Sequence, residues 1–439
     1  MYRHWKQLLN LLWQEAVKLD LIQSPWFSYK KNHLYCGNIP LQDIINNTGT
    51  PVYIYNKQFF QNRYNDFKEA FKKLDNSIFF SVKSNFNISV IKTFLDLGCG
   101  ADVNSQGEMF RALQAGVKPR NLILSGVGKT KDEIKMGLEQ DILLLKAESE
   151  EEILVINDIA GKLNKIARVG IRVNPNVDAK THPYISTGLM ENKFGLNIDE
   201  AVQLFKMGNK LKNIKFTAID MHIGSQIISI DPFSEAIDRL SEVYFRLKES
   251  GIKLEHFDIG GGIGVSYKGE KIFSLKDLAS VIIPKLKKLD CKVFFEPGRF
   301  LTANGGILVS QVLFTKMNYD KNFIITDAAM NDLLRPSIYN AYHHIQPVNL
   351  FPGREDINAD IVGPVCESGD FFAKDRVISK MNREEYLAIL SCGSYGMVMS
   401  SNYNGRRRPP EVMVDNNNFN IIRSRETYEH LIWDEKLNN

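Results

Sequence analysis

The sequence predicts an α/β protein in which a parallel (β/α)₈ barrel is joined to a β-rich second domain. The first observation is that short apolar runs alternate with helical segments between residues 78 and 295. The second is that polar residues or glycines follow most of these runs, as expected where barrel strands end at a common rim. The third is a change beyond residue 307 to short apolar runs separated by Gly, Pro and Asn, a pattern typical of β-rich domains.

The barrel prediction depends on eight apolar runs of a length typical of buried strands. Helix-start signals lie between them, because Ser105 is followed by Glu108 and Thr130 by Glu133, each at the spacing of a capping box. Strands and helices therefore alternate as parallel pairing requires. The runs occupy residues 78–82, 101–103, 122–124, 142–145, 169–173, 218–221, 257–259 and 293–295.

The domain boundaries follow from the same patterns. We expect the barrel over residues 51–306 and the β-rich domain over 307–439, completed by an N-terminal segment over 26–50. In residues 1–25, Trp5 and several leucines stand at helical spacing, which predicts an amphipathic helical extension. This stretch has neither the continuous apolar segment nor the cleavage site of a signal peptide.

The composition is that of a globular protein, with 44% hydrophobic and 24% charged residues in a chain of 439. The net charge of +4 is small for this length and gives no support for nucleic-acid or membrane binding. The five cysteines are scattered and odd in number, which argues against a disulfide framework or a zinc site. His343 and His344 are adjacent and would point apart on a helix. We therefore expect a cytoplasmic protein without a metal.

Lys83 is the candidate nucleophile. It stands directly after the first predicted strand, where an apolar run gives way to Ser84 and Asn85. A lysine amine must lose its proton to attack a carbonyl, and desolvation at the mouth of an apolar core lowers its pKa in the required direction. A solvated surface lysine is the simpler alternative.

The rim also carries candidate anion-binding groups. Gly260, Gly261 and Gly262 follow the seventh run, and their amides suit a phosphate monoester. The spacing does not match a dinucleotide fingerprint, and a tight turn is the alternative. Glu296, Pro297, Gly298 and Arg299 follow the eighth run, where the carboxylate is placed to face a ring nitrogen and the guanidinium to bind an anion. A surface turn is the alternative there.

Other candidates have equally plain alternatives. His222 is placed to lie on an aromatic cofactor, with Ser225 near its phosphate, or is a structural histidine. Arg335 and Tyr339 stand one helical turn apart and suit a substrate carboxylate, or form a surface pair. Cys366 is an acid beside Glu367, or a buried filler.

Taken in order, these segments resemble the fold-type III pyridoxal-phosphate decarboxylases, and within them the diaminopimelate decarboxylases. The resemblance extends over residues 27–430, and its departures, such as Val82, Ser84, Cys392 and Ser394, remove no functional group. The first 25 residues have no counterpart. The matching segments are residues 81–85, 100–105 with Glu108, 192–195, 222–226, 260–264, 296–299, 335–339, 366–370, 394–396 and 401–404.

The resemblance implies that pyridoxal 5'-phosphate is the cofactor. Lys83 would hold it covalently, Glu296 would keep its pyridine nitrogen protonated, and His222 would stack on its ring. The glycines, Ser225 and Tyr395 would bind the phosphate. The residues implied to contact the cofactor are Lys83, Asp102, His222, Ser225, Gly260, Gly261, Gly262, Glu296, Gly298, Arg299 and Tyr395.

The resemblance also implies a homodimer with shared active sites. Cys366 and Glu367 would reach into the partner's site, where the thiol would reprotonate the carbanion and the carboxylate would read the amino group at the D-configured end. Lys83, Cys366 and His222 would be the catalytic residues. The substrate would contact Arg299, Arg335, Tyr339, Glu367 and Tyr395.

The activity implied is decarboxylation of meso-2,6-diaminopimelate to L-lysine and CO₂, the last step of lysine biosynthesis. Glu296 supports decarboxylation because an acidic partner makes the ring a strong electron sink. One alternative is a related ornithine, lysine or arginine decarboxylase, which would not need Arg335 for a distal carboxylate. The other is a non-catalytic cofactor-binding homologue, which would be expected to lack Lys83 or Cys366.

Overall fold

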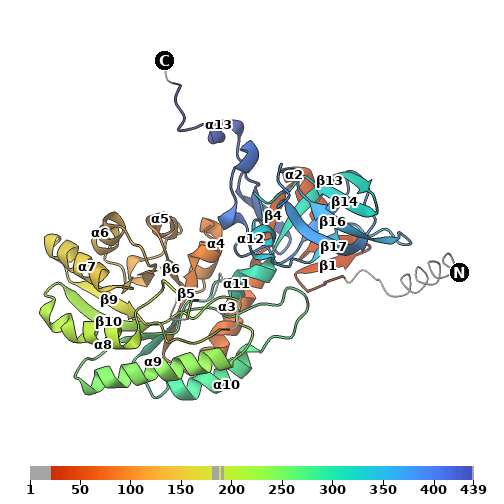
Figure 1. The fold of residues 1–439 in the computed structure, drawn as a ribbon. Coiled ribbons are helices and arrows are strands. Elements are labelled where there is room, and N and C mark those ends of the chain that lie inside the picture. The colour runs from red at the N-terminus through yellow and green to blue at the C-terminus, as the bar shows by residue number, and fades with distance from the viewer. Residues whose placement is uncertain (1–20, 180–186, 189–191, 438–439) are drawn as a thin grey trace. The chain divides into compact units, whose positions relative to one another are not determined.

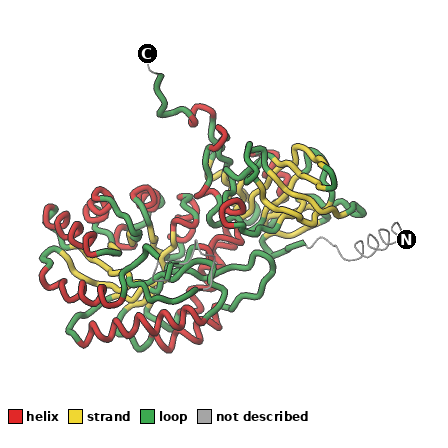
Figure 2. Tube along the Cα trace, in the orientation of Figure 1, coloured by secondary structure: helices red, strands yellow, loops and turns green. Residues whose placement is uncertain are grey.

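The computed structural model describes residues 21–179, 187–188 and 192–437, and the chain divides into two compact units (Figures 1 and 2). The barrel unit is Phe59–Ala303, and the β unit combines Met1–Gln58 with Asn304–Asn439. The sequence places these boundaries at 50/51 and 306/307. Residues 1–20, where most of the amphipathic helix is predicted, lie outside the described residues.

The barrel unit contains a closed barrel in which each strand pairs in parallel with the next and β12 returns to β5. All eight predicted runs form these strands, so the predicted fold class is confirmed. The strands are β5 (Asn76–Ser81), β6 (Gly100–Val103), β7 (Leu122–Leu124), β8 (Leu144–Ala147), β9 (Ala167–Arg172), β10 (Ile214–Asp220), β11 (His256–Asp258) and β12 (Lys292–Phe295).

Helices connect the strands, as Figure 2 shows for the barrel unit. The apolar residues on one face of each longer helix are buried. Thr130 and Glu133 form the predicted capping box, whereas Ser105 accepts from the Glu108 amide and the Glu108 carboxylate turns instead to the Asn104 amide. The helices are α3 (Lys57–Phe71), α4 (Ile88–Leu95), α5 (Gln106–Gln114), α6 (Lys131–Glu139), α7 (Glu150–Lys162), α8 (Ile198–Met207), α9 (Asp231–Glu249), α10 (Leu275–Leu286) and α11 (Arg299–Thr302).

The interior of the barrel consists of an apolar layer followed by a polar one. Side chains alternate along a strand, so a residue two positions after an inward-facing residue also faces inward. The apolar layer contains Phe79, Ile123, Leu144, Ala218 and Phe294. The residues two positions further along these strands, together with Asp258 of β11, form what we call the polar layer: Ser81, Ser125, Lys146, Asp220, Asp258 and Glu296.

The β unit is organised around a mixed sheet in the order β17-β16-β14-β13-β4-β19-β20, with β18 pairing β13 and β15. Strands β1, β2 and β3 form a separate antiparallel sheet. The strands are β1 (Phe27–Lys30), β2 (His33–Cys36), β3 (Ile39–Pro40), β4 (Val52–Asn56), β13 (Gly306–Asn318), β14 (Lys321–Thr326), β15 (Ile345–Pro347), β16 (Asp356–Val362), β17 (Phe371–Ser379), β18 (Tyr386–Ile389), β19 (Glu411–Asp415) and β20 (Asn418–Arg423).

One hydrophobic core joins the two ends of the chain within this unit. Phe27 and Leu34 pack in the same cluster as Val52, Ile307 and Val412. This cluster confirms that the N-terminal segment completes the β-rich domain. The helices of the β unit are α2 (Leu41–Thr48), α12 (Arg335–Tyr339) and α13 (Tyr428–Leu431). Across the part of the chain that the structure describes, no helix is both long enough and apolar enough to cross a membrane.

Candidate active site

Lys83 lies on a short turn at the end of β5, and hydrogen bonds hold this turn in place. It is the middle residue of a 3₁₀ helix, η1 (Val82–Ser84), that begins directly after the strand. The Ser84 hydroxyl donates to the Ser81 carbonyl at 2.8 Å, and the Ser81 amide donates to the Pro297 carbonyl at 3.2 Å. The turn that carries Lys83 is thereby attached to the segment that follows Glu296.

The charge of Lys83 acts on two groups of the barrel. Burial raises the pKa of Glu108, and the positive charge of Lys83 partly opposes this shift. The pKa of His222 lies well below its ordinary value because the surrounding protein excludes water from the ring and because Lys83, Arg172 and Lys146 add positive charge. His222 is therefore a neutral imidazole at neutral pH, and a neutral ring is suited to lie against an aromatic ligand.

The glycines after β11 form a narrow backbone turn next to His222. Gly260 and Gly262 have φ angles of +68° and +101°. A Cβ atom on Gly261 would lie 2.3 Å from the Glu296 carbonyl oxygen, so only glycine fits. The Gly261 amide donates to His222 Nδ1 at 3.3 Å, and the Glu296 amide donates to the Gly260 carbonyl at 2.8 Å.

Arg299 and Ser225 add a charged group and a hydroxyl group to this region. The Arg299 Nη2 atom donates to Ser225 Oγ at 3.0 Å, and Nη1 donates to the Tyr267 hydroxyl at 2.8 Å. The Arg299 side chain is buried, at 6% exposure. A guanidinium, a hydroxyl and a glycine turn together make a donor set suited to a phosphate.

The polar layer contains an ammonium group, that of Lys146, which the sequence pattern does not predict. Lys146 Nζ lies 2.8 Å from Asp220 Oδ1 and 2.8 Å from Asp258 Oδ2, and it also donates to Glu296 Oε1. The fourth predicted strand ends at residue 145, whereas β8 runs to Ala147 and includes the lysine. Its inward position follows from the alternation that starts at Leu144.

Burial dominates the acid–base behaviour of this layer. The pKa of Glu296 is raised well above its ordinary value by burial and by the neighbouring Asp102 and Asp258, with Lys146 acting in the opposite direction. Burial raises the pKa of Asp220 to about 6, again against the effect of Lys146. The pKa of Lys146 is raised well above its ordinary value because the charges of the carboxylates outweigh its desolvation.

Asp102 lies beside this layer. Its two carboxylate oxygens accept hydrogen bonds from Ser81 Oγ at 3.0 Å and Ser125 Oγ at 2.6 Å. A second missed pair lies nearby: Arg172 bonds Glu148 at 2.9 Å and also donates to the His222 carbonyl at 3.3 Å. Arg172 thereby helps to place the end of β10 that leads into His222.

The barrel residues fit pyridoxal phosphate by the chemistry of their groups. Lys83 supplies an amine, Glu296 supplies an acid in the barrel interior, and the glycine turn with Ser225 and Arg299 supplies phosphate donors. The close approach of Gly261 to the Glu296 carbonyl excludes a side chain from this turn, and the Gly261 amide donates to His222 Nδ1. Gly298 belongs to the same assembly, because a Cβ atom there would lie 3.0 Å from Ser84.

The remaining predicted site residues belong to the β unit. Arg335 begins α12 and is buried, with Nη1 2.9 Å from His343 Nε2, and His343 Nδ1 lies 2.8 Å from the Leu390 carbonyl. Donation from Nδ1 to that carbonyl leaves Nε2 to accept from the guanidinium. Tyr339 ends the same helix. Tyr395 has a φ angle of +54°, an uncommon conformation for a residue with a side chain.

Cys366 and Glu367 lie exposed in the loop of residues 363–370, so the alternative that this thiol is buried filler is wrong. The buried carboxylate of Asp370 organises the loop by accepting from the Met330 and Val365 amides, each at 2.7 Å. A hydrogen bond with Glu367 raises the pKa of Tyr403. The loop is therefore held at its base while its thiol faces solvent.

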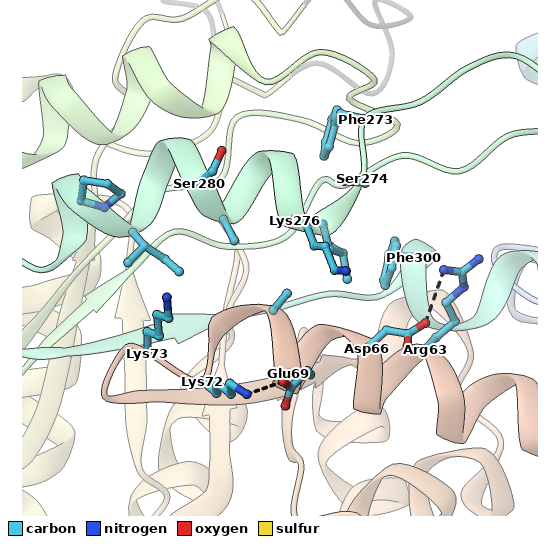
Figure 3. Close-up of a pocket in the computed structure, with 15 residues that line it drawn as sticks. Arg63, Asp66, Glu69, Lys72, Lys73, Phe273, Ser274, Lys276, Ser280 and Phe300 are labelled. Carbon is cyan, nitrogen blue, oxygen red and sulfur yellow. Dashed lines mark hydrogen bonds and ion pairs between the residues drawn. The ribbon is translucent and has the colours of Figure 1, made fainter.

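The barrel unit has a groove of about 940 Å³ between α3 and α10 (Figure 3). Phe273 and Phe300 line it together with charged residues such as Lys73 and Lys276, which Figure 3 labels. None of the predicted site residues lines this groove. The predicted barrel site is therefore carried by strand ends and not by this outer groove.

Comparison with known proteins identifies the family. Residues 57–303 match the model "Pyridoxal-dependent decarboxylase, pyridoxal binding domain". The chain is 45% identical to the diaminopimelate decarboxylase of Aquifex aeolicus, over 93% of this chain and 97% of that protein. It is also 45% identical to the diaminopimelate decarboxylase of Haemophilus influenzae, over 92% and 98% of the two chains.

A solved structure agrees with these relatives. The diaminopimelate decarboxylase of Helicobacter pylori, complexed with L-lysine, matches with a TM-score of 0.86 and 41% identity, covering 90% of this chain and 98% of that one. The resemblance predicted from short segments is confirmed over almost the whole chain, and with it the cofactor, pyridoxal phosphate. This chain belongs to the pyridoxal-dependent decarboxylases and, within them, to the diaminopimelate decarboxylase family.

Proposed function

We propose that this chain decarboxylates meso-2,6-diaminopimelate, releasing L-lysine and CO₂. The observation that carries the proposal is the presence of Lys83 after β5 and of Glu296 after β12, two neighbouring strands of the barrel, in a chain 45% identical to a diaminopimelate decarboxylase over 93% of its length. The L-lysine bound by the Helicobacter pylori relative is the product that this reaction would release.

The barrel residues are assigned to the cofactor. When bound, pyridoxal phosphate supplies an electron sink for the charge left by the departing CO₂. Lys83 would attach the cofactor, His222 would lie on its ring, and Glu296 would face the ring nitrogen. The neutral state of His222 supports its assignment, because a neutral imidazole adds no positive charge above the ring.

The phosphate end is assigned to Ser225, Arg299 and the glycine turn, with Gly298, Asp102 and Tyr395 completing the cofactor site. The hydrogen bonds between Arg299 and Ser225 support this assignment, because they hold a cation and a hydroxyl side by side. An anion bound there would be recognised by charge as well as by backbone amides.

The substrate is assigned to Arg299, Arg335, Tyr339, Tyr395 and Glu367. A guanidinium binds a carboxylate through two parallel N–H groups, which suits the distal carboxylate of a diamino diacid. The contact of Arg335 with His343 supports this role, since His343 fixes one edge of the guanidinium without adding a negative charge. Glu367 would bind the amino group at the reacting centre.

We propose that Cys366 returns a proton to the substrate carbon, and that it does so in the active site of a second protomer. Its exposed position supports a function outside its own chain, because an acid that serves its own core would be expected to be buried. The homodimer and a cytoplasmic location complete this proposal. The absence of a disulfide among the described cysteines is compatible with such a location.

The test is CO₂ release by purified protein supplied with pyridoxal phosphate. We expect release from the meso acid and none from L-lysine or L-ornithine under the same conditions. A preference for either basic amino acid would instead favour the related decarboxylases. A protein that binds the cofactor but releases CO₂ from none of these substrates would be the non-catalytic homologue.

A further inference from the structure

We propose that Lys146 is a positioning residue for the cofactor: its ammonium holds Glu296 as a carboxylate against the ring nitrogen and, through Asp258, also holds the first amide of the glycine turn. This inference rests on the proposed contact between Glu296 and the ring. It assigns a role to Lys146, a residue of the polar layer that neither attaches the cofactor nor binds its phosphate.

Inside the barrel, the ammonium of Lys146 lies among carboxylates that come from the ends of three other strands. Lys146 extends from β8, and its partners stand at the ends of β10 and β11 and directly after β12. The side chains of Lys146, Asp220 and Asp258 are only 1%, 2% and 0% exposed, and that of Glu296 is 7% exposed. Three carboxylates around one buried ammonium leave it little freedom to move.

Lys146 contacts Glu296 through one oxygen only. The hydrogen bond reaches Oε1, so Oε2 is the oxygen that would accept from the ring nitrogen. The ammonium would therefore lie on the carboxyl side of a proton shared between Glu296 and the ring. A positive charge placed in this way repels a shared proton away from Glu296 and toward the ring nitrogen.

The neighbouring charges explain why such a cation is needed. Asp102 and Asp258 both favour the neutral form of Glu296, as does burial, and Lys146 opposes them. If Glu296 kept its proton, it would leave the ring nitrogen unprotonated and the electron sink weak. With Lys146 in place, the O–H proton of Glu296 would pass to the ring nitrogen of the bound cofactor, leaving a carboxylate paired with an N–H cation. No other reactant is required.

A second connection runs from Lys146 to the phosphate side. Asp258 Oδ2 contacts Lys146 at 2.8 Å, while Asp258 Oδ1 accepts from the Gly260 amide at 2.8 Å. The Gly260 carbonyl in turn accepts from the Glu296 amide at 2.8 Å. Removal of the ammonium would therefore loosen both the carboxylate that faces the ring and the start of the glycine turn.

The experiment uses the holoenzyme of Lys146→Met, reconstituted with pyridoxal phosphate that carries ¹⁵N at the ring nitrogen. We expect the ¹⁵N chemical shift to move from the protonated toward the unprotonated position. We also expect the apparent dissociation constant of the cofactor to rise about 10- to 100-fold, the range typical of losing a group that orients a ligand-holding residue.

The matched control is Lys129→Met. Lys129 is a second lysine with a buried side chain and pairs with Glu152 at 2.7 Å, but no contact joins it to Glu296. Its variant should keep the ¹⁵N shift and the affinity of the unaltered holoenzyme. The same change in both variants would mean that loss of any buried lysine perturbs the site, and this would overturn the proposal.

Two further variants distinguish failure of the role of Lys146 from failure of the contact between Glu296 and the ring. Glu296→Gln should move the ¹⁵N shift as Lys146→Met does; if only Glu296→Gln moves it, Lys146 has no positioning role and the inference fails while the proposed function stands. If neither moves it, the contact of Glu296 with the ring fails as well. Should Lys146→Met not fold, Lys146→Met combined with Asp220→Asn removes one charge of each sign, and it should show the same shift.

Discussion

The polar layer of the barrel and the loop of residues 363–370 in the β unit hold their ionisable groups in opposite ways. In the polar layer, Lys146 and Glu296 are buried and in contact, and their pKa values lie far from the ordinary ones. In the loop, Cys366 and Glu367 face solvent, and only Asp370 at the base is buried. The barrel thus arranges its charges within one chain, whereas the loop presents its groups outward, as the proposed role in a partner's site requires.

The largest effect is expected for Lys83→Ala, which removes the residue proposed to attach the cofactor. Lys83→Ala should remove the absorbance of the covalently bound cofactor and lower CO₂ release by roughly 10⁴-fold or more, the scale of losing a residue that forms a covalent bond to the reacting group. Absorbance spectra and turnover of the two proteins measure this. Lys92→Ala, which removes only an exposed pair with Asp96, should change neither. An unchanged spectrum for Lys83→Ala would contradict the assignment.

Cys366→Ala tests the loop and should leave the polar layer untouched. We expect normal cofactor absorbance with turnover lowered by about 10²- to 10⁴-fold, because a positioned acid is lost. Mixing this variant with Lys83→Ala should restore about a quarter of wild-type turnover if sites are shared, since half of randomly assorted two-fold dimers carry one intact site. Cys291→Ala is the thiol control. No recovery on mixing would place Cys366 in its own chain's site.

Gly261→Ala tests how closely the glycine turn must approach the segment after β12. The added methyl group would lie 2.3 Å from the Glu296 carbonyl oxygen, so the backbone must move. We expect a loss of about 1–3 kcal/mol in the free energy of unfolding, typical of overpacking, together with weaker cofactor binding. Denaturant unfolding and cofactor titration measure both effects. Gly128→Ala meets no atom within 4 Å and should leave both unchanged; equal behaviour of the two variants would remove the steric argument.

The smallest expected effect is a change in how stability depends on pH. Because burial raises the pKa of Asp220 from 3.8 to about 6, the folded protein binds more protons than the unfolded chain between these values. The contribution of Asp220 to stability is therefore complete below pH 3.8 and is lost as the pH rises toward 6. Asp220→Asn should flatten this part of the curve for the cofactor-free protein, measured by urea unfolding at several pH values.

The control for that measurement is Asp277, whose pKa is shifted in the opposite direction from that of Asp220. A hydrogen bond from Ser274 lowers the pKa of Asp277, so the contribution of Asp277 is present above its ordinary pKa and is lost as the pH falls. Asp277→Asn should therefore lower stability near neutral pH and have little effect at low pH. A curve for Asp220→Asn that keeps the original slope between pH 4 and 6 would show that the layer is not ionised as described.

The sequence predicted the barrel strands well because buried parallel strands are short apolar runs, and it placed Lys83 correctly because that lysine follows such a run. The same rule fails at Lys146, because a lysine is expected to follow a buried apolar run, whereas β8 continues through this one. Counting two positions from Leu144 would have placed it inside the barrel. Arg335 contacts His343 across the end of α12, where the chain leaves the helix at a left-handed Asn340, so no single helical or strand pattern relates the two residues and the contact needed the structure.

Strand β4 has a consequence for how the protein is made. It pairs with β13 on one side and with β19 on the other, so both neighbours come from beyond the barrel in the chain. At a translation rate of about 5–20 residues per second, β4 leaves the ribosome tens of seconds before β19 exists. The barrel, by contrast, is contiguous and has all its partners early. During that interval a newly made chain carries the unpaired backbone groups of β4, which can pair with the strand edge of another chain.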